Sequence, residues 1–361
     1  MPKYEPLTRD EVASVIDGRA KTRRVPVYIH MWVHPTEFGD REPAVREILA
    51  RYPEDIQLVP FVMPAQYRGQ HQDAPDYAWL PWPAPQAAQQ TAIDAQVGLD
   101  DWGRLDEVIE KFPEAGFPGL WNWAGPRDTR YRMGHWWFCL FERHWSLRGM
   151  TNALMDYYTN PKEVHRLFRA LTDFYVGIID RAGREQHCDG IWTSDDLGTQ
   201  TGEFFSPKIF REFYKPYYKE MIDAAHAHNM HFWLHACGNV KQFIPEWIDI
   251  GLDVLHPIQK HTMDEKEIAA RFGDKITIFA GLDVQQVIPW GTPQEVRREV
   301  RFLLDTYWRP GEGRCMITAG NGINGDCTLE SLEAFFDESF SYGTQVVKTK
   351  DFAARGRPGC S

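Results

Sequence analysis

GIWTSD at Gly190–Asp195 and HFWLHAC at His231–Cys237 are short, largely apolar runs separated by the amphipathic stretch Ser206–Asn229. A strand, a helix and a second strand in this order are typical of a βαβ unit with parallel strands. The helix carries its own start signal, because Ser206 suits the N-cap and Pro207 suits the first helical position. This stretch therefore predicts an α/β protein with a parallel sheet.

The same alternation continues on both sides of this unit. Toward the C-terminus it predicts strands at Asp253–Ile258, Ile276–Asp283 and Cys315–Ala319, and helices at Val240–Ile250, Met263–Phe272 and Thr292–Trp308. Toward the N-terminus it predicts strands at Pro26–Val33, Ile56–Met63 and Gly119–Trp123, and helices at Glu42–Arg51 and Pro161–Arg184. The C-terminal half alone holds about five βα units, which implies about eight in all, so we expect a (β/α)8 TIM barrel.

The length of 361 residues suits one barrel with insertions. We expect a single barrel domain over residues 1–349, followed by a mobile tail over residues 350–361. Residues 64–118 are rich in Pro, Gln and aromatic residues, show little periodicity and are too many for an ordinary barrel loop. We interpret them as an insertion that caps the pocket mouth.

The charge balance limits the possible partners. Lys and Arg number 40 against 51 Asp and Glu, a formal net charge of −11, so the chain would repel nucleic acid and anionic membranes. No apolar run approaches the ~18 residues of a membrane span, and the N-terminus has no apolar signal core. The six cysteines are irregularly spaced, which argues against a disulfide framework. We expect a cytoplasmic protein that acts on a small molecule.

Polar residues at the ends of parallel barrel strands point toward a common cavity. The sharpest motif is HACG, in which His235 and Cys237 are alternate residues of an extended segment and therefore face the same way. Imidazole and thiolate side by side suit zinc, and His256, Asp195 or Asp196 could complete the site. The alternative is a hydrogen-bonded pocket histidine beside a small buried cysteine.

Three further positions are candidates for catalysis. Asp195 and Asp196 are adjacent on a strand end and face opposite ways, so one can enter the cavity while the other caps a helix or pairs. His30 lies near the end of the first predicted strand, at the same face. Asn321, in the turn after the last predicted strand, is a candidate for substrate binding at this face. The alternative is that both aspartates only organise the loop and the helix start at Ser206.

Tryptophan and arginine alternate between residues 121 and 148. Such a surface would suit a flat, carboxylated or methoxylated ligand, because guanidinium groups and aromatic faces both bind such groups. The candidates for substrate binding are Trp121, Trp123, Arg127, Trp136 and Trp137. The alternative is that these rings pack the insertion onto the barrel.

The ordered motifs TSDDLGTQ, SPKIFREFYKP, HACGN, GLDVLHPIQ, FAGLDVQQ and GINGDCTLESLEAF together resemble the uroporphyrinogen decarboxylase superfamily, over about residues 119 to 343. The resemblance implies a (β/α)8 barrel, often a homodimer. It also implies one of two activities, porphyrinogen decarboxylation or zinc-dependent methyl transfer to or from a corrinoid (cobalamin) protein.

The decarboxylase branch of the resemblance implies an arginine-rich segment of the form Arg-Gln-Ala-Gly-Arg after the first strand, which binds propionates. Here the stretch from His30 to Pro35 reads HMWVHP and contains no arginine. An eight-carboxylate tetrapyrrole would then leave several charges unpaired, which is costly in a closed pocket. True uroporphyrinogen decarboxylase activity is therefore disfavoured, although Asp195 or Asp196 resembles the catalytic aspartate of that branch.

The methyltransferase branch implies His235 and Cys237 as zinc ligands, with a third thiolate in a Gly-Cys-Gly turn after the last strand. Asn321 stands there instead, so His256, an acid or Cys327 would have to complete the site. The leading hypothesis is a zinc-dependent methyltransferase that exchanges a methyl group between a methoxylated aromatic or thiol substrate and a corrinoid protein. The alternatives are a metal-free decarboxylase and a non-catalytic corrinoid- or tetrapyrrole-binding protein.

Overall fold

The computed structural model describes residues 3–31, 33–61, 78–82, 97–121 and 125–355. The contacts within the chain divide it into two compact units. The first unit comprises Met1–Gln57, Pro126–Arg132 and Asp253–Ser361, and the second comprises Leu58–Gly125 and Met133–Leu252. Among the described residues the strands are β1 (Ile56–Pro60), β2 (Tyr131–His135), β3 (Gly190–Ser194), β4 (His231–His235), β5 (Val254–His256), β6 (Thr277–Leu282) and β7 (Cys315–Ala319).

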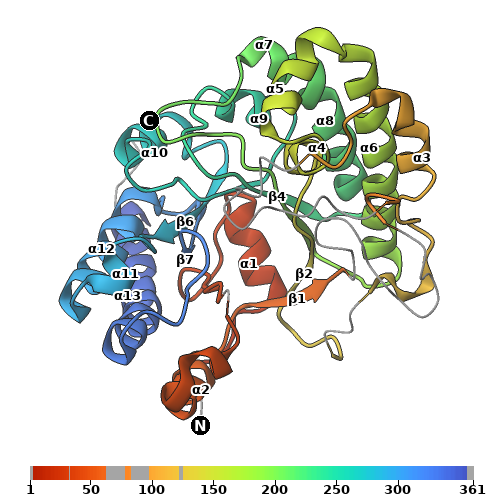
Figure 1. Cartoon of the computed structure of the whole chain (residues 1–361). Helices are drawn as coiled ribbons and strands as arrows, with labels where there is room; N and C mark the ends of the chain where they lie inside the picture. The colour runs from red at the N-terminus through yellow and green to blue at the C-terminus, as the bar shows by residue number, and fades with distance from the viewer. Residues whose placement is uncertain (1–2, 32, 62–77, 83–96, 122–124, 356–361) are drawn as a thin grey trace, which may run out of the picture. The chain divides into compact units, whose positions relative to one another are not determined.

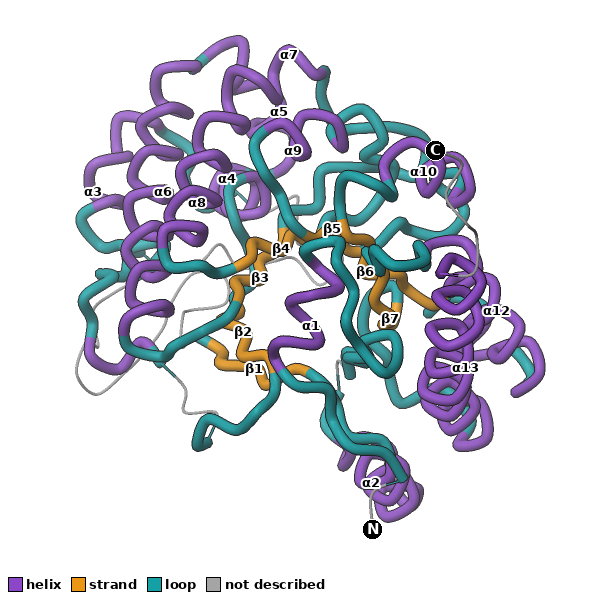
Figure 2. The backbone as a smooth tube through the Cα atoms, turned by 180° about the vertical axis from the view of Figure 1, so that it is seen from behind, coloured by secondary structure: helices purple, strands orange, loops and turns teal. Residues whose placement is uncertain are grey.

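In the second unit β3 pairs in parallel with residues 133–135 of β2 on one side and with β4 on the other. Every residue of β3 is buried, because helices cover the sheet and the apolar run GIWTS meets no solvent. The helices are α3 (Leu105–Ile109), α4 (Phe141–Arg148), α5 (Met150–Thr159), α6 (Pro161–Arg184), α7 (Pro207–Ile209), α8 (Lys215–Ala227) and α9 (Ile244–Asp249). α6 and α8 lie side by side on the outside of these strands (Figure 2).

In the first unit β5, β6 and β7 pair in parallel in chain order. Its helices are α1 (Arg9–Ile16), α2 (Glu42–Arg51), α10 (Glu265–Phe272), α11 (Val287–Trp290), α12 (Pro293–Tyr307) and α13 (Leu329–Arg355). Thr292 and Glu295 form a capping box at the start of α12, which satisfies backbone groups that the helix itself leaves unpaired. α12 and α13 lie against each other (Figure 1).

The predicted first strand, Pro26–Val33, contacts β7 in the first unit through its described residues. Val27 forms a parallel bridge with Ile317, and the Asp55 N–H donates to the Val27 carbonyl at 3.1 Å. The segment therefore has β7 on one edge and the start of β1 on the other, the position of a first strand in a barrel. The structure confirms an α/β fold with parallel strands, whereas the single domain over residues 1–349 stays a prediction.

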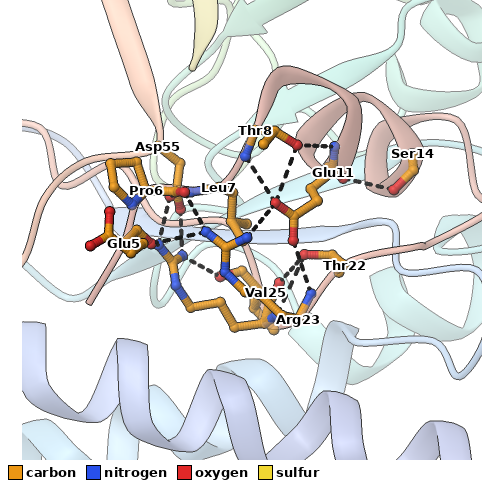
Figure 3. Close-up of polar contacts among 11 residues, drawn as sticks. Glu5, Pro6, Leu7, Thr8, Glu11, Ser14, Thr22, Arg23, Val25 and Asp55 are labelled. Atoms are coloured by element: carbon orange, nitrogen blue, oxygen red, sulfur yellow. Dashed lines mark hydrogen bonds and ion pairs between the residues drawn. The ribbon is translucent and has the colours of Figure 1, made fainter. Parts of the chain in front are cut away.

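A buried ion pair fixes the N-terminal segment of the first unit. Arg24 forms two hydrogen bonds with Asp55, at 2.5 and 2.6 Å, and their side chains are 2% and 0% exposed. Asp55 also accepts the Leu7 N–H at 2.6 Å (Figure 3). We infer that this pair holds the N-terminal segment against the start of β1. Removing either partner would leave a buried charge without its counter-charge, which is strongly destabilising.

The predicted strand at Gly119–Trp123 is wrong. Pro118–Leu120 forms a 3-10 turn, and Trp121 makes only an isolated antiparallel bridge to Phe61. The strand in this region is β2, with the sequence YRMGH. The sequence does not indicate a buried strand, because it contains the charged residue Arg132. Arg132 is nevertheless buried, and its Nη1 donates a hydrogen bond to Gln57 Oε1 at 2.9 Å. Residues 122–124 lie outside the described residues.

The described part of the predicted insertion packs on α6. The Trp79 ring is fully buried and meets the Phe112 and Phe174 rings edge-on, with centroids 5.0 and 5.6 Å away. Asp106 of α3 forms an ion pair with Arg166 of α6, and the two helices lie side by side (Figure 2). Residues 62–77 and 83–96 lie outside the described residues, so the capping of a pocket by the insertion stays a prediction.

The last helix reaches further than the expected tail boundary. α13 continues to Arg355, and Lys350 still contacts Asp305 at 3.1 Å, which holds this part of the helix on the first unit. Residues 356–361 lie outside the described residues, and their mobility stays a prediction. Among the described helices, none combines the length and the apolar character that crossing a bilayer requires.

Candidate metal centre

The ends of β3 and β4 bring together, in the second unit, three side chains of kinds that can hold a metal ion. The distance from His235 Nε2 to Cys237 Sγ is 3.2 Å, and that from His235 Nε2 to Asp196 Oδ1 is 3.4 Å. All three ligand atoms lie within 4.8 Å of one another. His235 and Cys237 of the HACG motif thus form a group with Asp196, and these three side chains are called the metal-binding group below.

The loops that carry this group approach each other closely. The Gly198 N–H donates to the Cys237 carbonyl at 3.1 Å, and the Cys237 N–H donates to Asp196 Oδ1 at 2.8 Å. Gly238 has φ +85°, and a Cβ there would lie 2.2 Å from the Gly198 backbone. Glycine is therefore required at position 238, both for its backbone conformation and for space.

The two aspartates differ as strand geometry predicts, with their side chains in different surroundings. Asp195 is completely buried and accepts the backbone N–H groups of Leu140, Phe141 and Glu142 at 2.8 to 3.1 Å and the Tyr218 hydroxyl at 2.6 Å. It therefore caps the start of α4, not the helix at Ser206. The Asp196 side chain retains 41% exposure and belongs to the metal-binding group.

The electrostatics of the group favour an ionised aspartate beside a protonated thiol. Burial raises the pKa of Asp196, but its hydrogen bond to His235 and the charge of that ring outweigh burial and lower the pKa below the usual value. Burial and then the Asp196 charge raise the pKa of Cys237 well above that of a free thiol. A divalent cation at this point would favour the thiolate instead, because the positive charge stabilises it.

Glu142 is a residue of this region that the sequence did not single out for chemistry. It is buried, and the Ser194 hydroxyl donates a hydrogen bond to its Oε2. Burial, followed by the charges of Asp196 and Asp195, raises the pKa of Glu142 well above that of a free carboxyl group. Burial and the neighbouring carboxylates therefore favour the protonated form of Glu142.

Of two neighbouring tryptophans, one lies beside the group. The half-buried Trp137 ring meets the His235 ring edge-on at 5.6 Å and the Trp192 ring at 5.5 Å. Trp136 is only 3% exposed and stacks on Tyr175 at 5.4 Å, which is a packing contact. The geometry brings Trp137 to the candidate centre and assigns Trp136 to the core.

The other predicted substrate-binding residues are not gathered at this point. Trp121 packs on Phe61 with ring centroids 4.0 Å apart, and Trp123 lies outside the described residues. Arg127 is exposed on the first unit, and Asn321 is half-buried in the turn after β7 of that unit. Their roles in substrate binding stay predictions.

His256 and His30 belong to the first unit. His256 is completely buried, and its Nε2 lies 3.0 Å from the Ala319 carbonyl oxygen. The group of possible metal ligands in the second unit consists of Asp196, His235 and Cys237, and the role of His256 as a ligand stays a prediction. His30 is buried with its ring 6.4 Å from that of Tyr28, and its catalytic role stays a prediction.

These observations define a class of protein. The chain is an α/β protein with parallel strands, and the ends of two neighbouring strands present one oxygen, one nitrogen and one sulfur donor. Three protein donors are the number that a catalytic zinc site uses when it keeps its fourth position open.

Comparison with known proteins places the chain in a family. Residues 145–342 match the uroporphyrinogen decarboxylase (URO-D) family, which is more than half of the 361 residues. The chain therefore belongs to the uroporphyrinogen decarboxylase family, as its motifs indicated.

Two relatives are methyltransferases of the archaeon Methanosarcina mazei. A methylated-thiol–coenzyme M methyltransferase is 23% identical over 192 residues, a match that covers 52% of this chain and 47% of that protein. The chain thus spans about half the length of that curated relative. A solved methyltransferase structure from the same organism superposes with a TM-score of 0.61 at 15% identity, over 94% of this chain and 99% of that one. At this identity the superposition shows a shared fold.

Proposed function

We propose that the chain is a zinc-dependent methyltransferase with a (β/α)8 barrel, which exchanges a methyl group between a small substrate and the corrinoid of a partner protein. The observation that carries the proposal is the convergence of Asp196, His235 and Cys237 at the ends of β3 and β4. A methyltransferase among the relatives of a URO-D family chain supports the same activity.

The residues present fit zinc. Imidazole nitrogen, thiolate sulfur and carboxylate oxygen are all donors that zinc accepts. Asp196 supplies the third donor, which compensates for Asn321 in the turn where the methyltransferase branch carries a cysteine. Bound zinc would lower the pKa of a substrate thiol or polarise a methyl-donor oxygen.

The chain's own residues prepare the site for this chemistry. Cys237 would lose its proton to solvent if it bound zinc, and its backbone N–H holds the Asp196 carboxylate in place at 2.8 Å. Trp137 offers a flat apolar surface next to His235, suited to an aromatic ring of a methoxylated substrate. Glu142 keeps a proton close to the group, where it is available to a departing oxygen or sulfur.

The geometry favours this function over a metal-free decarboxylase. In a decarboxylase an aspartate would stabilise a developing cation, and of the adjacent pair only Asp196 retains solvent exposure. Asp195 is enclosed and accepts four hydrogen bonds, so it lacks access to a substrate. Asp196 in turn lies within reach of a metal shared with His235 and Cys237.

The test combines metal content with turnover. Protein purified without added metal should contain close to one zinc per chain, and methylcobalamin should be consumed when a thiol or an aryl methyl ether is supplied. Cys237→Ser should remove both the zinc and the turnover while circular dichroism stays unchanged. Cys188→Ser is the matched control, because that cysteine lies in the same unit but outside the group, and it should retain both.

Each alternative gives a different result. Protein that stays metal-free after dialysis with zinc, yet decarboxylates a small acid, would support the decarboxylase. Protein that binds a corrinoid but does not consume methylcobalamin would support a binding protein without turnover.

A further inference from the structure

The first unit contains a hollow of about 620 Å³ that is separate from the residues used above. It lies among the loops after β5 and β6 and the helices α10 and α12, and every residue that lines it belongs to the first unit. Loops after parallel strands are where α/β proteins place their ligands, because the strand ends open there. The hollow is therefore in a position where binding sites are usual.

A histidine and an aspartate form a pair at the wall of this hollow. His261 Nε2 lies 3.1 Å from Asp283 Oδ2, and Asp283 is only 4% exposed. The other oxygen, Oδ1, accepts the N–H groups of Gln285 and Gln286 at 2.8 and 3.0 Å, so the carboxylate is fixed. A carboxylate partner places the ring hydrogen on Nε2 and leaves the lone pair on Nδ1.

The histidine is held in an uncommon conformation. His261 has φ +64°, a left-handed backbone that residues other than glycine seldom adopt. Its side chain nevertheless remains 58% exposed, so the ring is oriented by Asp283 and not by burial. Strained backbones of this kind concentrate at ligand sites, where a fixed side chain is useful.

The charges around the hollow are predominantly negative. The Lys260 ammonium lies between two glutamates, 2.8 Å from Glu265 and in contact with Glu299, which neutralise it. Four carboxylates face two lysines in the lining, namely Asp264, Glu265, Asp283 and Glu299 against Lys260 and Lys266. This balance attracts a cation and repels an anion.

We propose that this hollow binds a small ligand that carries both an ammonium group and a hydroxyl or thiol, an amino alcohol or aminothiol. His261 Nδ1 accepts the hydrogen of the hydroxyl or thiol, while the surrounding carboxylates attract the ammonium. The proposal does not depend on zinc or on methyl transfer, because none of the lining residues belongs to the metal-binding group.

The probes are ethanolamine, ethylamine and glycolate, titrated into the full chain while the ring signals of histidine are followed by NMR. The His261 signals are identified as those missing from His261→Gln. Ethanolamine should shift them saturably and bind about fivefold more weakly to His261→Gln, the usual effect of one hydrogen bond. Ethylamine lacks the hydroxyl and should bind wild type as weakly as ethanolamine binds the variant, whereas glycolate should not bind.

The matched control is His187→Gln. His187 is also exposed and also has a positive φ, of 49°, but it lies in the second unit, away from the hollow. This variant should bind ethanolamine like wild type, and the zinc content of both variants should equal that of wild type.

Four results would overturn the proposal, and the first three concern ethanolamine and glycolate. They are no saturable shift of the His261 signals by ethanolamine, equal binding of glycolate, and equal affinity in wild type and His261→Gln. If ethylamine binds wild type as tightly as ethanolamine does, His261 does not accept a hydroxyl and the assignment is also wrong.

Discussion

The ends of β4 and β5 carry the same residue in different surroundings. His235 ends β4 with its Nε2 3.2 Å from the Cys237 sulfur, whereas His256 ends β5 with its Nε2 3.0 Å from the Ala319 carbonyl oxygen. Both rings are buried. A nitrogen that bonds to a carbonyl oxygen must carry the hydrogen, so His256 Nε2 offers no lone pair to a metal and only Nδ1 of that ring could be a ligand. The comparison teaches that a strand-end histidine becomes a candidate ligand when other donor atoms gather around its ring nitrogen, as Asp196 and Cys237 do around His235.

Two single variants, in which one or the other histidine is replaced by glutamine, test this difference. Their zinc contents should show the largest effect among these predictions. His235→Gln should lose its zinc completely on dialysis against a chelator, because two remaining protein ligands seldom hold the metal. His256→Gln should keep close to one zinc per chain. Elemental analysis of both variants, with circular dichroism as a check of folding, makes the comparison. Equal loss of zinc from two folded variants would show that His256 is a ligand after all.

The sequence was sufficient wherever the signal is local. The apolar run of β3 and the start signal at Ser206 and Pro207 each lie within a few residues, and the structure confirms a strand and a helix start there. His235 and Cys237 are two residues apart, so their shared face followed from strand geometry alone.

The sequence failed where a residue's role depends on distant partners. Arg132 interrupts the pattern of β2, and its partner Gln57 is 75 residues away. The choice between Asp195 and Asp196 depends on N–H groups more than 50 residues earlier in the chain, such as that of Glu142, 53 residues before Asp195. Such contacts leave no periodic signal, so the third donor of the candidate centre stayed open between several residues.

The adjacent residues Trp136 and Trp137 give a second comparison, between a ring in the core and a ring beside the candidate metal centre. Trp136→Ala should lower the free energy of unfolding by about 3–5 kcal/mol, because it removes a large buried ring that stacks on Tyr175. Trp137→Ala should cost far less stability, since its ring is half-buried, but it should weaken substrate binding beside His235. Urea unfolding and substrate affinity measured on both variants separate the two effects. Equal losses of stability would mean that both rings belong to the core.

The adjacent residues Asp195 and Asp196 give a third comparison, between a structural and a metal-binding side chain, with a smaller expected change in stability. Asp195→Asn should lower the free energy of unfolding by about 2–3 kcal/mol, because the amide hydrogens would face the N–H groups at the start of α4. Asp196→Asn should change stability little and instead weaken zinc binding, since amides are poor zinc ligands. Chemical unfolding and metal titration of the pair test this. A stable Asp195→Asn that loses zinc would reverse the two roles.

Asp156 of α5 gives the smallest expected effect and completes the contrast with Asp196. Its side chain is buried and accepts hydrogen bonds from Arg148 at 2.8 and 3.1 Å and from Trp102 at 2.9 Å. Burial alone would raise the pKa of Asp156, but the hydrogen bonds with His144, Arg148 and Trp102 outweigh it and lower the pKa far below the usual value. A carboxyl group with a lowered folded pKa stabilises the protein above its unfolded pKa, which is about 3.9.

This stabilisation should be lost as the pH falls from about 3.9 toward the folded pKa, because the unfolded chain then binds a proton that the folded protein refuses. Asp156→Asn has no such group, so its stability should not share this part of the acid dependence. The difference in the free energy of unfolding between wild type and Asp156→Asn should therefore shrink by about 1 kcal/mol from pH 5 to pH 3. Urea unfolding at several pH values measures it. A difference that stays constant over this range would show that Asp156 has the same pKa in the folded and the unfolded state, so that its hydrogen bonds do not favour the ionised carboxylate.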